Sequence, residues 1–248
     1  MRRGAMKAKT KKIIIWSVSV TAFLLALVLA FAIYVADCYQ ASDAAEAYVK
    51  KGEVQPNEIS RGVYAFEPNE TSVGFIFYPG GKVEHDAYYP LMQRCAEYGI
   101  LSIVVEMPFN LAVLDVDAAD GIKEKYPDIK SWYIGGHSLG GSMAASYAAD
   151  NALDFEGVIL LASYSTADLS QTELSVLSVY GSEDGVLNAE KYEKYLSNMP
   201  SAFEEHVIDG GCHAYFGMYG AQDGDGEPTI SNEEQIDITV RHIAGFVF

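Results

Sequence analysis

The chain has 248 residues, half of them hydrophobic, with a formal net charge of −17, which suits one catalytic-sized domain and an appendage. All 34 acidic residues but only 11 of the 17 Lys and Arg residues follow residue 36, which gives that part a formal charge of −23. Such an acidic domain lacks the clustered basic residues that bind phosphate backbones, which excludes nucleic acid as a partner. Three cysteines are too few for a disulfide framework, and no C-x-x-C or H-E-x-x-H pattern occurs, so we expect neither a metal nor another cofactor.

The first predicted element is a transmembrane signal-anchor over residues 13–36. Residues 1–12 carry six basic side chains, and the next 24 residues carry no charge. As a helix they would extend roughly 36 Å, enough to cross a hydrocarbon core of about 30 Å. The basic segment is expected in the cytoplasm, which places the rest of the chain outside it. Because Ala30-Phe31-Ala32 is typical of a cleavage site, secretion after signal cleavage is the alternative, although cleavable apolar segments are usually shorter.

Beyond the apolar segment, we expect a juxtamembrane helix and linker over residues 37–60 and one domain over residues 61–248. The predicted strands are residues 73–78, 100–105, 132–134, 158–161, 174–180 and 203–208. The predicted helices are residues 41–51, 87–98, 112–125, 138–150, 189–198 and 232–246. Apolar strands that alternate with helices indicate an α/β fold with a mostly parallel sheet flanked by helices.

The segment Gly136–Gly140 reads G-x-S-x-G and joins a predicted strand to a predicted helix. Alone, this pentapeptide also fits a glycine-rich turn, so its setting decides. Ligands bind outside the carboxyl ends of parallel strands, and Ser138, Asp184 and His213 each follow a predicted strand in the order Ser, acid, His. Glu183 is the alternative acid. His213 is preferred over the four other histidines because of its loop position and its place in this order.

These motifs resemble the α/β-hydrolase superfamily, and within it a small, lid-poor, dienelactone-hydrolase-like branch. The resemblance rests on FYPGGKVE, GGHSLGG, YGSEDGV and GGCHAYFG, and it covers the chain after the apolar segment. Larger members of the superfamily insert a cap between the strands predicted here as the fourth and fifth. Only residues 162–173 lie there, so we expect an α/β-hydrolase fold with no large cap domain and an open cleft.

The predicted activity is hydrolysis of a carboxylic ester or related acyl bond through an acyl-enzyme on Ser138. In this reading His213 is the general base, and Asp184 orients its imidazole and stabilises the imidazolium. Acyl transfer by the same three residues and a catalytically inactive binding module remain alternatives. The expected partners are a small-molecule acyl substrate and the membrane, and the sequence predicts no oligomeric state.

The oxyanion of an acyl-transfer intermediate needs two N–H donors. The backbone N–H of Leu139, directly after the serine, is the first candidate. Gly81 is the second, with Lys82 as an alternative, because Pro79-Gly80 stands where the superfamily commonly has His-Gly.

Other residues after the strands are weaker candidates for the site. Those expected to bind substrate are Lys82, Phe109, Asn110 and Tyr215. His137 adjoins the serine but is expected to point away from it. The segment Asp223–Gly226 alternates Asp and Gly, but it lacks the further acidic ligands of a calcium loop and therefore predicts a turn.

Overall fold

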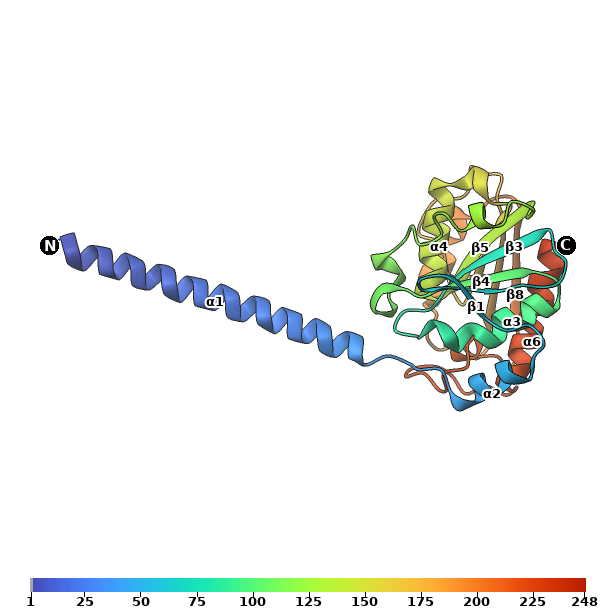
Figure 1. Cartoon of the computed structure of the whole chain (residues 1–248), viewed down its shortest axis with the longest axis horizontal. Helices are drawn as coiled ribbons and strands as arrows, with labels where there is room; N and C mark the ends of the chain where they lie inside the picture. The colour runs from blue at the N-terminus through green and yellow to red at the C-terminus, as the bar shows by residue number, and fades with distance from the viewer. Residues whose placement is uncertain (1) are drawn as a thin grey trace. The chain divides into compact units, whose positions relative to one another are not determined.

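The structure is a computed structural model that describes residues 2–248, with side chains from Thr10 onward (Figure 1). Met1, the first residue of the predicted basic segment, lies outside the described residues. The chain divides after Cys38 into two compact units. The first unit consists largely of helix α1 (Arg2–Ala36), in which Thr10–Ala36 is long and apolar enough to cross a membrane, with a mean hydropathy of 2.6. The predicted apolar helix is therefore present.

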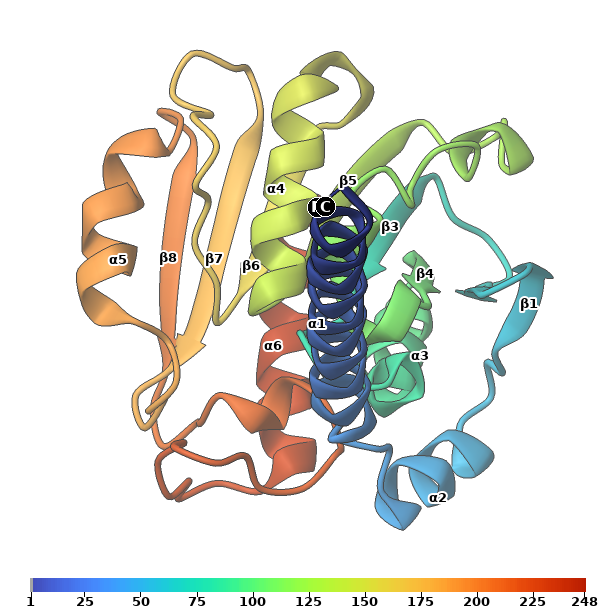
Figure 2. The same cartoon turned by 90° about the vertical axis from the view of Figure 1, so that its left-hand side faces the viewer.

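The second unit, Tyr39–Phe248, is built around one sheet that has eight strands among the described residues (Figure 2). In chain order the strands are β1 (Asn57–Ser60), β2 (Val63–Phe66), β3 (Val73–Tyr78), β4 (Leu101–Val105), β5 (Ser131–His137), β6 (Gly157–Leu161), β7 (Ser175–Gly181) and β8 (Phe203–Ile208). Their order across the sheet is β1-β2-β4-β3-β5-β6-β7-β8. The pairs from β4 to β8 are parallel, and β1 and β2 join antiparallel at one edge. The predicted mostly parallel sheet is confirmed.

Helices cover both faces of this sheet. They are α2 (Asp43–Lys51), α3 (Tyr89–Glu97), α4 (Leu139–Asp150), α5 (Ala189–Tyr195) and α6 (Asn232–Val247). Successive residues of β3 serve opposite faces, because side chains alternate along a strand. Phe75 and Phe77 pack in the core beneath α2, α3 and α6, whereas Ile76 and Tyr78 pack in the core beneath α4. Burial on both faces explains why this strand consists of apolar and aromatic residues throughout.

The segment between the apolar helix and the predicted domain, residues 37–60, contributes two elements to the larger unit. Helix α2 is capped by Ser42 and buries Ala45 and Val49 in the core. The side chain of Gln93 donates a hydrogen bond of 2.9 Å to the Val49 carbonyl, which fastens α2 to α3. Strand β1 follows and pairs with β2. Neither strand was predicted, because each has four residues and β1 is largely polar and exposed.

The helix predicted over residues 112–125 is wrong. This fully described stretch contains two short 3₁₀ turns, Ala112–Leu114 and Lys123–Lys125. Between them, the buried Tyr78 hydroxyl donates to the Val116 carbonyl and accepts from the Ala119 N–H, both at 2.9 Å. An α-helix would pair these backbone groups within itself. A tertiary contact has therefore replaced the local hydrogen bonds of the expected helix.

The predicted absence of a large cap agrees with the structure. Residues 162–174, all of them described, join β6 to β7 through bends and turns without a helix. The carboxyl ends of the parallel strands, and the loops that follow them, therefore meet at one edge of the sheet without a covering domain.

Candidate active site

Ser138 lies at the junction of β5 and α4 in a backbone conformation that is rare for a residue with a side chain. Its φ is 51° and its ψ is −120°. Two hydrogen bonds fix this conformation: the Ser138 N–H donates to the Leu161 carbonyl at 2.9 Å, and the Ser163 hydroxyl donates to the Ser138 carbonyl at 2.6 Å. This strained conformation places the serine side chain at the N-terminus of α4, where the helix dipole stabilises negative charge.

The two glycines of the G-x-S-x-G segment are required by close packing against the end of β3. A Cβ atom on Gly136 would lie 2.4 Å from the Tyr78 carbonyl oxygen, and one on Gly140 would lie 2.2 Å from the same oxygen. Because the obstacle is backbone, a side chain at either position could not be accommodated by a rotamer change. This agrees with the steric reason expected from the sequence.

His213 is hydrogen-bonded to Asp184, with 2.9 Å between His213 Nδ1 and Asp184 Oδ2. The two side chains are only 1% and 2% exposed. Asp184 Oδ1 also accepts the N–H groups of Val186 at 2.9 Å and Leu187 at 2.8 Å, which fixes the carboxylate in place. The alternative acid, Glu183, is exposed and accepts a hydrogen bond from its neighbouring serine. Asp184 is therefore the acid that contacts the imidazole.

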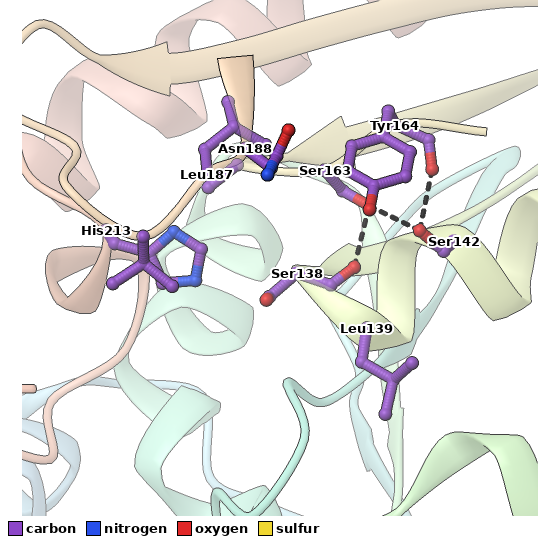
Figure 3. A pocket seen from close by; sticks show the side chains of 10 residues that line it. Ser138, Leu139, Ser142, Ser163, Tyr164, Leu187, Asn188 and His213 are labelled. Atoms are coloured by element: carbon purple, nitrogen blue, oxygen red, sulfur yellow. Dashed lines mark hydrogen bonds between the residues drawn. The ribbon is translucent and has the colours of Figure 1, made fainter. Parts of the chain in front are cut away.

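Ser138 and His213 line one cavity of about 220 Å³ (Figure 3). The remaining lining residues are Leu139, Ser142, Ala162, Ser163, Tyr164, Val186, Leu187 and Asn188. Figure 3 shows the Ser138 side chain pointing toward the His213 ring. Within the described part of the chain, the buried Nε2 atom of His213 has no hydrogen-bond partner. No described residue, Ser138 included, is hydrogen-bonded to His213 Nε2, so the site holds a hydroxyl and an imidazole in one cavity, with the other ring nitrogen bonded to a carboxylate.

His137, expected to point away from the serine, packs against the imidazole of His213. The two ring centroids are 4.5 Å apart. His137 Nδ1 is 2.8 Å from the Tyr88 hydroxyl, which also accepts the N–H of Gly80 at 3.1 Å. Burial lowers the pKa of His137 well below its ordinary value, so this second imidazole is neutral. His137 therefore supports His213 as a packed, uncharged neighbour.

Asp225 gives the predicted turn at Asp223–Gly226 a structural role. Its carboxylate accepts the backbone N–H groups of His213 at 3.1 Å, Gly185 at 3.1 Å and Ala214 at 2.8 Å. Burial acts to raise the pKa of Asp225, but the hydrogen bonds from these backbone groups outweigh it and leave the pKa below its ordinary value. Asp225 thus ties the loop after β8 to the turn after β7. Nothing in the alternation of Asp and Gly indicated this contact.

The loop after β3 brings Gly81 against Leu139. A Cβ atom on Gly81 would lie 3.0 Å from Leu139 Cδ2. Leu139 is the first residue of α4, so its N–H has no carbonyl to bind within the helix. The N–H of the alternative donor, Lys82, donates to the Asn110 carbonyl at 2.8 Å. Gly81 and Lys82 are the two candidates for the second oxyanion donor, and the N–H of Lys82 already has an acceptor.

The four residues predicted to bind substrate, all of them described, do not line the 220 Å³ cavity. Phe109 and Asn110 have φ values of 54° and 57° and form the turn that accepts from Lys82. The Tyr215 carbonyl accepts from the Asn232 side chain at 2.9 Å. The aromatic and aliphatic walls come instead from Tyr164, Val186 and Leu187. Tyr164 and Leu187 lie in loops outside the motifs, and Val186 ends the YGSEDGV motif without any sign of its place in the wall, so only the fold could have revealed these roles.

Residues 74–237, more than half of the chain, match the profile of the Alpha/beta hydrolase family, and the chain therefore belongs to this family. A solved structure described as a predicted CIB-like hydrolase from Thermoplasma acidophilum is similar, with a TM-score of 0.57, 18% identity, and coverage of 77% of this chain and 98% of that one. Est1E from Butyrivibrio proteoclasticus with bound ferulic acid is similar with a TM-score of 0.56, 12% identity, and coverage of 77% and 95%. No curated protein matches in sequence. At these identities the structural likeness shows the fold alone.

Proposed function

We propose that the protein is a serine hydrolase that acts on carboxylic esters or related acyl bonds. The observation that carries this proposal is the pairing of a strained, outward-pointing Ser138 with His213 in one cavity, where a buried carboxylate, Asp184, holds the imidazole. Membership of the Alpha/beta hydrolase family supports hydrolysis as the reaction class. The absence of a large cap between β6 and β7 supports a place in the small, lid-poor, dienelactone-hydrolase-like branch of that family.

In the proposed first half-reaction, Ser138 Oγ attacks the carbonyl carbon of the ester while its proton passes to His213 Nε2. The tetrahedral intermediate collapses, the bond from carbon to the alcohol oxygen breaks, and the departing alcohol takes the proton from His213. An acyl-enzyme on Ser138 remains. Asp184 keeps the imidazole oriented and stabilises the imidazolium formed between these steps.

In the second half-reaction, water attacks the acyl carbon and gives a proton to His213. Collapse of the second intermediate releases the carboxylic acid and returns the proton to Ser138 Oγ. Both intermediates carry an oxyanion, for which we assign the N–H groups of Leu139 and Gly81 as donors. Gly81 is preferred over Lys82 because it packs directly on Leu139, whereas the N–H of Lys82 is already bonded to Asn110.

The size of the cavity supports a compact acyl group. At about 220 Å³, it is smaller than the roughly 300–1,000 Å³ of pockets that enclose drug-sized ligands. Its walls at Tyr164, Val186 and Leu187 are aromatic or aliphatic. A short acyl chain or a single ring would fill this space, and the rest of a longer substrate would lie outside it. Est1E binds ferulic acid, so an aryl ester belongs among the test substrates.

The test is turnover of a graded panel of p-nitrophenyl esters and one feruloyl ester by the full chain in detergent. Wild type should favour short acyl groups, and Ser138→Ala should lower kcat/KM by at least about 10⁴-fold. Ser142→Ala is the matched control, because its hydroxyl lines the same cavity. Equal activity of wild type and Ser138→Ala would overturn the proposal.

We also propose that α1 is an uncleaved anchor that leaves the second unit on the extracytoplasmic side. Its length and hydropathy and the basic residues ahead of it support this orientation. The intact mass of the protein from isolated membranes should include residues 1–36. A mature protein that begins near residue 33 and lacks the apolar segment would show that the segment is a cleaved signal.

A further inference from the structure

Three large apolar side chains are exposed in a short segment after β4. Phe109, Val113 and Leu114 are 60%, 52% and 51% exposed. They belong to two successive 3₁₀ turns, Pro108–Asn110 and Ala112–Leu114, and we call them the apolar rim. The segment follows the carboxyl end of β4. Ser138 follows the carboxyl end of β5, which is parallel to β4, so both lie at the same end of the sheet.

The backbone connects the apolar rim to the first residue of the second unit. The Tyr39 N–H donates to the Lys82 carbonyl at 2.7 Å, and the Tyr39 carbonyl accepts from the Glu84 N–H at 3.0 Å. The Lys82 N–H in turn donates to the carbonyl of Asn110, next to Phe109, at 2.8 Å. Tyr39 is thus fastened to the loop that contains the proposed oxyanion donor and, through it, to the turn that presents the apolar rim.

The covalent chain limits how far this point can lie from the end of α1. Two residues separate Ala36 from Tyr39, so their Cα atoms are at most about 11 Å apart whatever the orientation of the two units. If α1 spans a bilayer, Tyr39 stays at the membrane surface. The loops that are hydrogen-bonded to Tyr39 then remain within reach of the same surface.

We propose that the apolar rim docks into the surface of a lipid bilayer and that the site at Ser138 takes amphiphilic esters from that bilayer. This substrate class rests on the proposed serine hydrolase function. The chain after residue 36 carries a formal charge of −23, and acidic residues such as Asp115 and Asp117 follow the rim, so attraction to anionic lipid cannot drive the docking. Burial of apolar side chains among the lipids drives it instead, and docking should weaken as the fraction of anionic lipid rises.

The first test uses the full chain reconstituted in phosphatidylcholine vesicles and two substrates, water-soluble p-nitrophenyl acetate and a fluorogenic long-chain ester dissolved in the bilayer. The double variant Val113→Asp/Leu114→Asp should hydrolyse the bilayer ester at least tenfold more slowly and p-nitrophenyl acetate within twofold of wild type. Leu153→Asp is the matched control. Leu153 is fully exposed and lies in the turn Ala152–Asp154 before β6. This turn is at the amino ends of the parallel strands, opposite the ends that carry Ser138 and the apolar rim. Leu153→Asp should leave both rates unchanged.

An unchanged rate with the bilayer ester in the double variant, or an equal loss in Leu153→Asp, would overturn the proposal. A wild-type protein inactive toward both substrates would instead contradict the hydrolase function. A second measurement, tryptophan fluorescence, does not depend on catalysis. The tryptophan added by Leu114→Trp in the full chain should raise the emission above that of the parent protein, and lipids brominated near the headgroup should quench this added emission. The emission added by Leu153→Trp should not be quenched. Equal quenching at the two positions, or protection of Leu114→Trp by self-association of the chain, would exclude the bilayer as the occupant.

Discussion

Asp225 Oδ1 accepts the backbone N–H of His213 at 3.1 Å, and the same carboxylate accepts the N–H groups of Gly185 and Ala214. One half-buried side chain therefore positions the loop of the proposed general base against the turn that carries its carboxylate partner. The hydrogen bonds also hold the pKa of Asp225 below its ordinary value. Asp225 acts on the backbone and does not reach the reacting atoms.

Asp225→Asn should weaken the site without removing any of its reacting groups. A neutral amide accepts fewer and weaker hydrogen bonds, so we expect a loss of about 2 kcal/mol of stability. The displaced imidazole should lower kcat by roughly 10²-fold with a smaller change in KM. Asp223→Asn, at an exposed acid in the same turn, is the control. Thermal unfolding and ester kinetics measure both effects, and wild-type values for Asp225→Asn would rule out the positioning role.

Asp184→Asn tests the orientation of the imidazole directly. An amide beside His213 Nδ1 can present its N–H where the carboxylate accepts, which favours the wrong tautomer and leaves the imidazolium without a counter-charge. We expect kcat to fall by about 10³–10⁴-fold and KM to change little. Glu183→Gln, on the exposed neighbouring acid, should stay within twofold of wild type. A larger loss of kcat in Glu183→Gln than in Asp184→Asn would show that the wrong acid has been assigned.

His137 should make stability dependent on pH. Burial lowers its pKa in the folded protein, whereas the unfolded chain binds a proton near pH 6.5. Below that pH the unfolded state therefore holds more protons than the folded state, and the free energy of unfolding falls with acidification by up to about 1.4 kcal/mol per pH unit. His137→Asn should reduce this slope between pH 7 and pH 5. His85 and His242, whose pKa values are also lowered, remain in both proteins, so the difference isolates His137. Denaturant unfolding at each pH gives the slopes, and identical slopes would contradict the account.

Two helical glycines should respond in opposite ways to alanine. A Cβ atom on Gly140 would meet the Tyr78 carbonyl oxygen at 2.2 Å, so Gly140→Ala must displace the backbone of β3 or of α4 and should cost about 3 kcal/mol or more. Gly245, exposed in α6, has open space around it, and Gly245→Ala should stabilise the protein by about 0.5–1 kcal/mol. Thermal unfolding in detergent measures both. Tolerance of alanine at position 140 would mean that α4 does not pack on β3 as described.

The sequence predicted the elements of the fold that depend on local patterns. Strand β3 begins and ends where the apolar run does, because every one of its side chains is buried on one face or the other. Strand β1 escaped prediction because the strand is short and its residues are exposed or half-buried. The false helix at residues 112–125 has helical composition, but Tyr78, far away in sequence, binds the backbone groups that would have formed it.

The same distinction applies to the candidate site. Ser138, Asp184 and His213 could be proposed because each follows a strand, and parallel strands bring their carboxyl ends together. The supporting contacts of Asp225 and His137 are made to backbone or across the core, so the spacing of residues gives no indication of them. Which residues form the walls of the cavity depends on the conformations of loops, so the sequence did not indicate it either.

The nucleophilic role of Ser138 is the central claim, and covalent labelling tests it most directly. The full-length protein in detergent is treated with a fluorophosphonate and digested, and the modified residue is located by mass spectrometry. We predict one phosphonyl adduct on Ser138, with no labelling of Ser138→Ala and normal labelling of Ser142→Ala. Folded wild-type protein that remains unlabelled at Ser138, or a Ser138→Ala variant that still labels in the same cavity, would contradict the account.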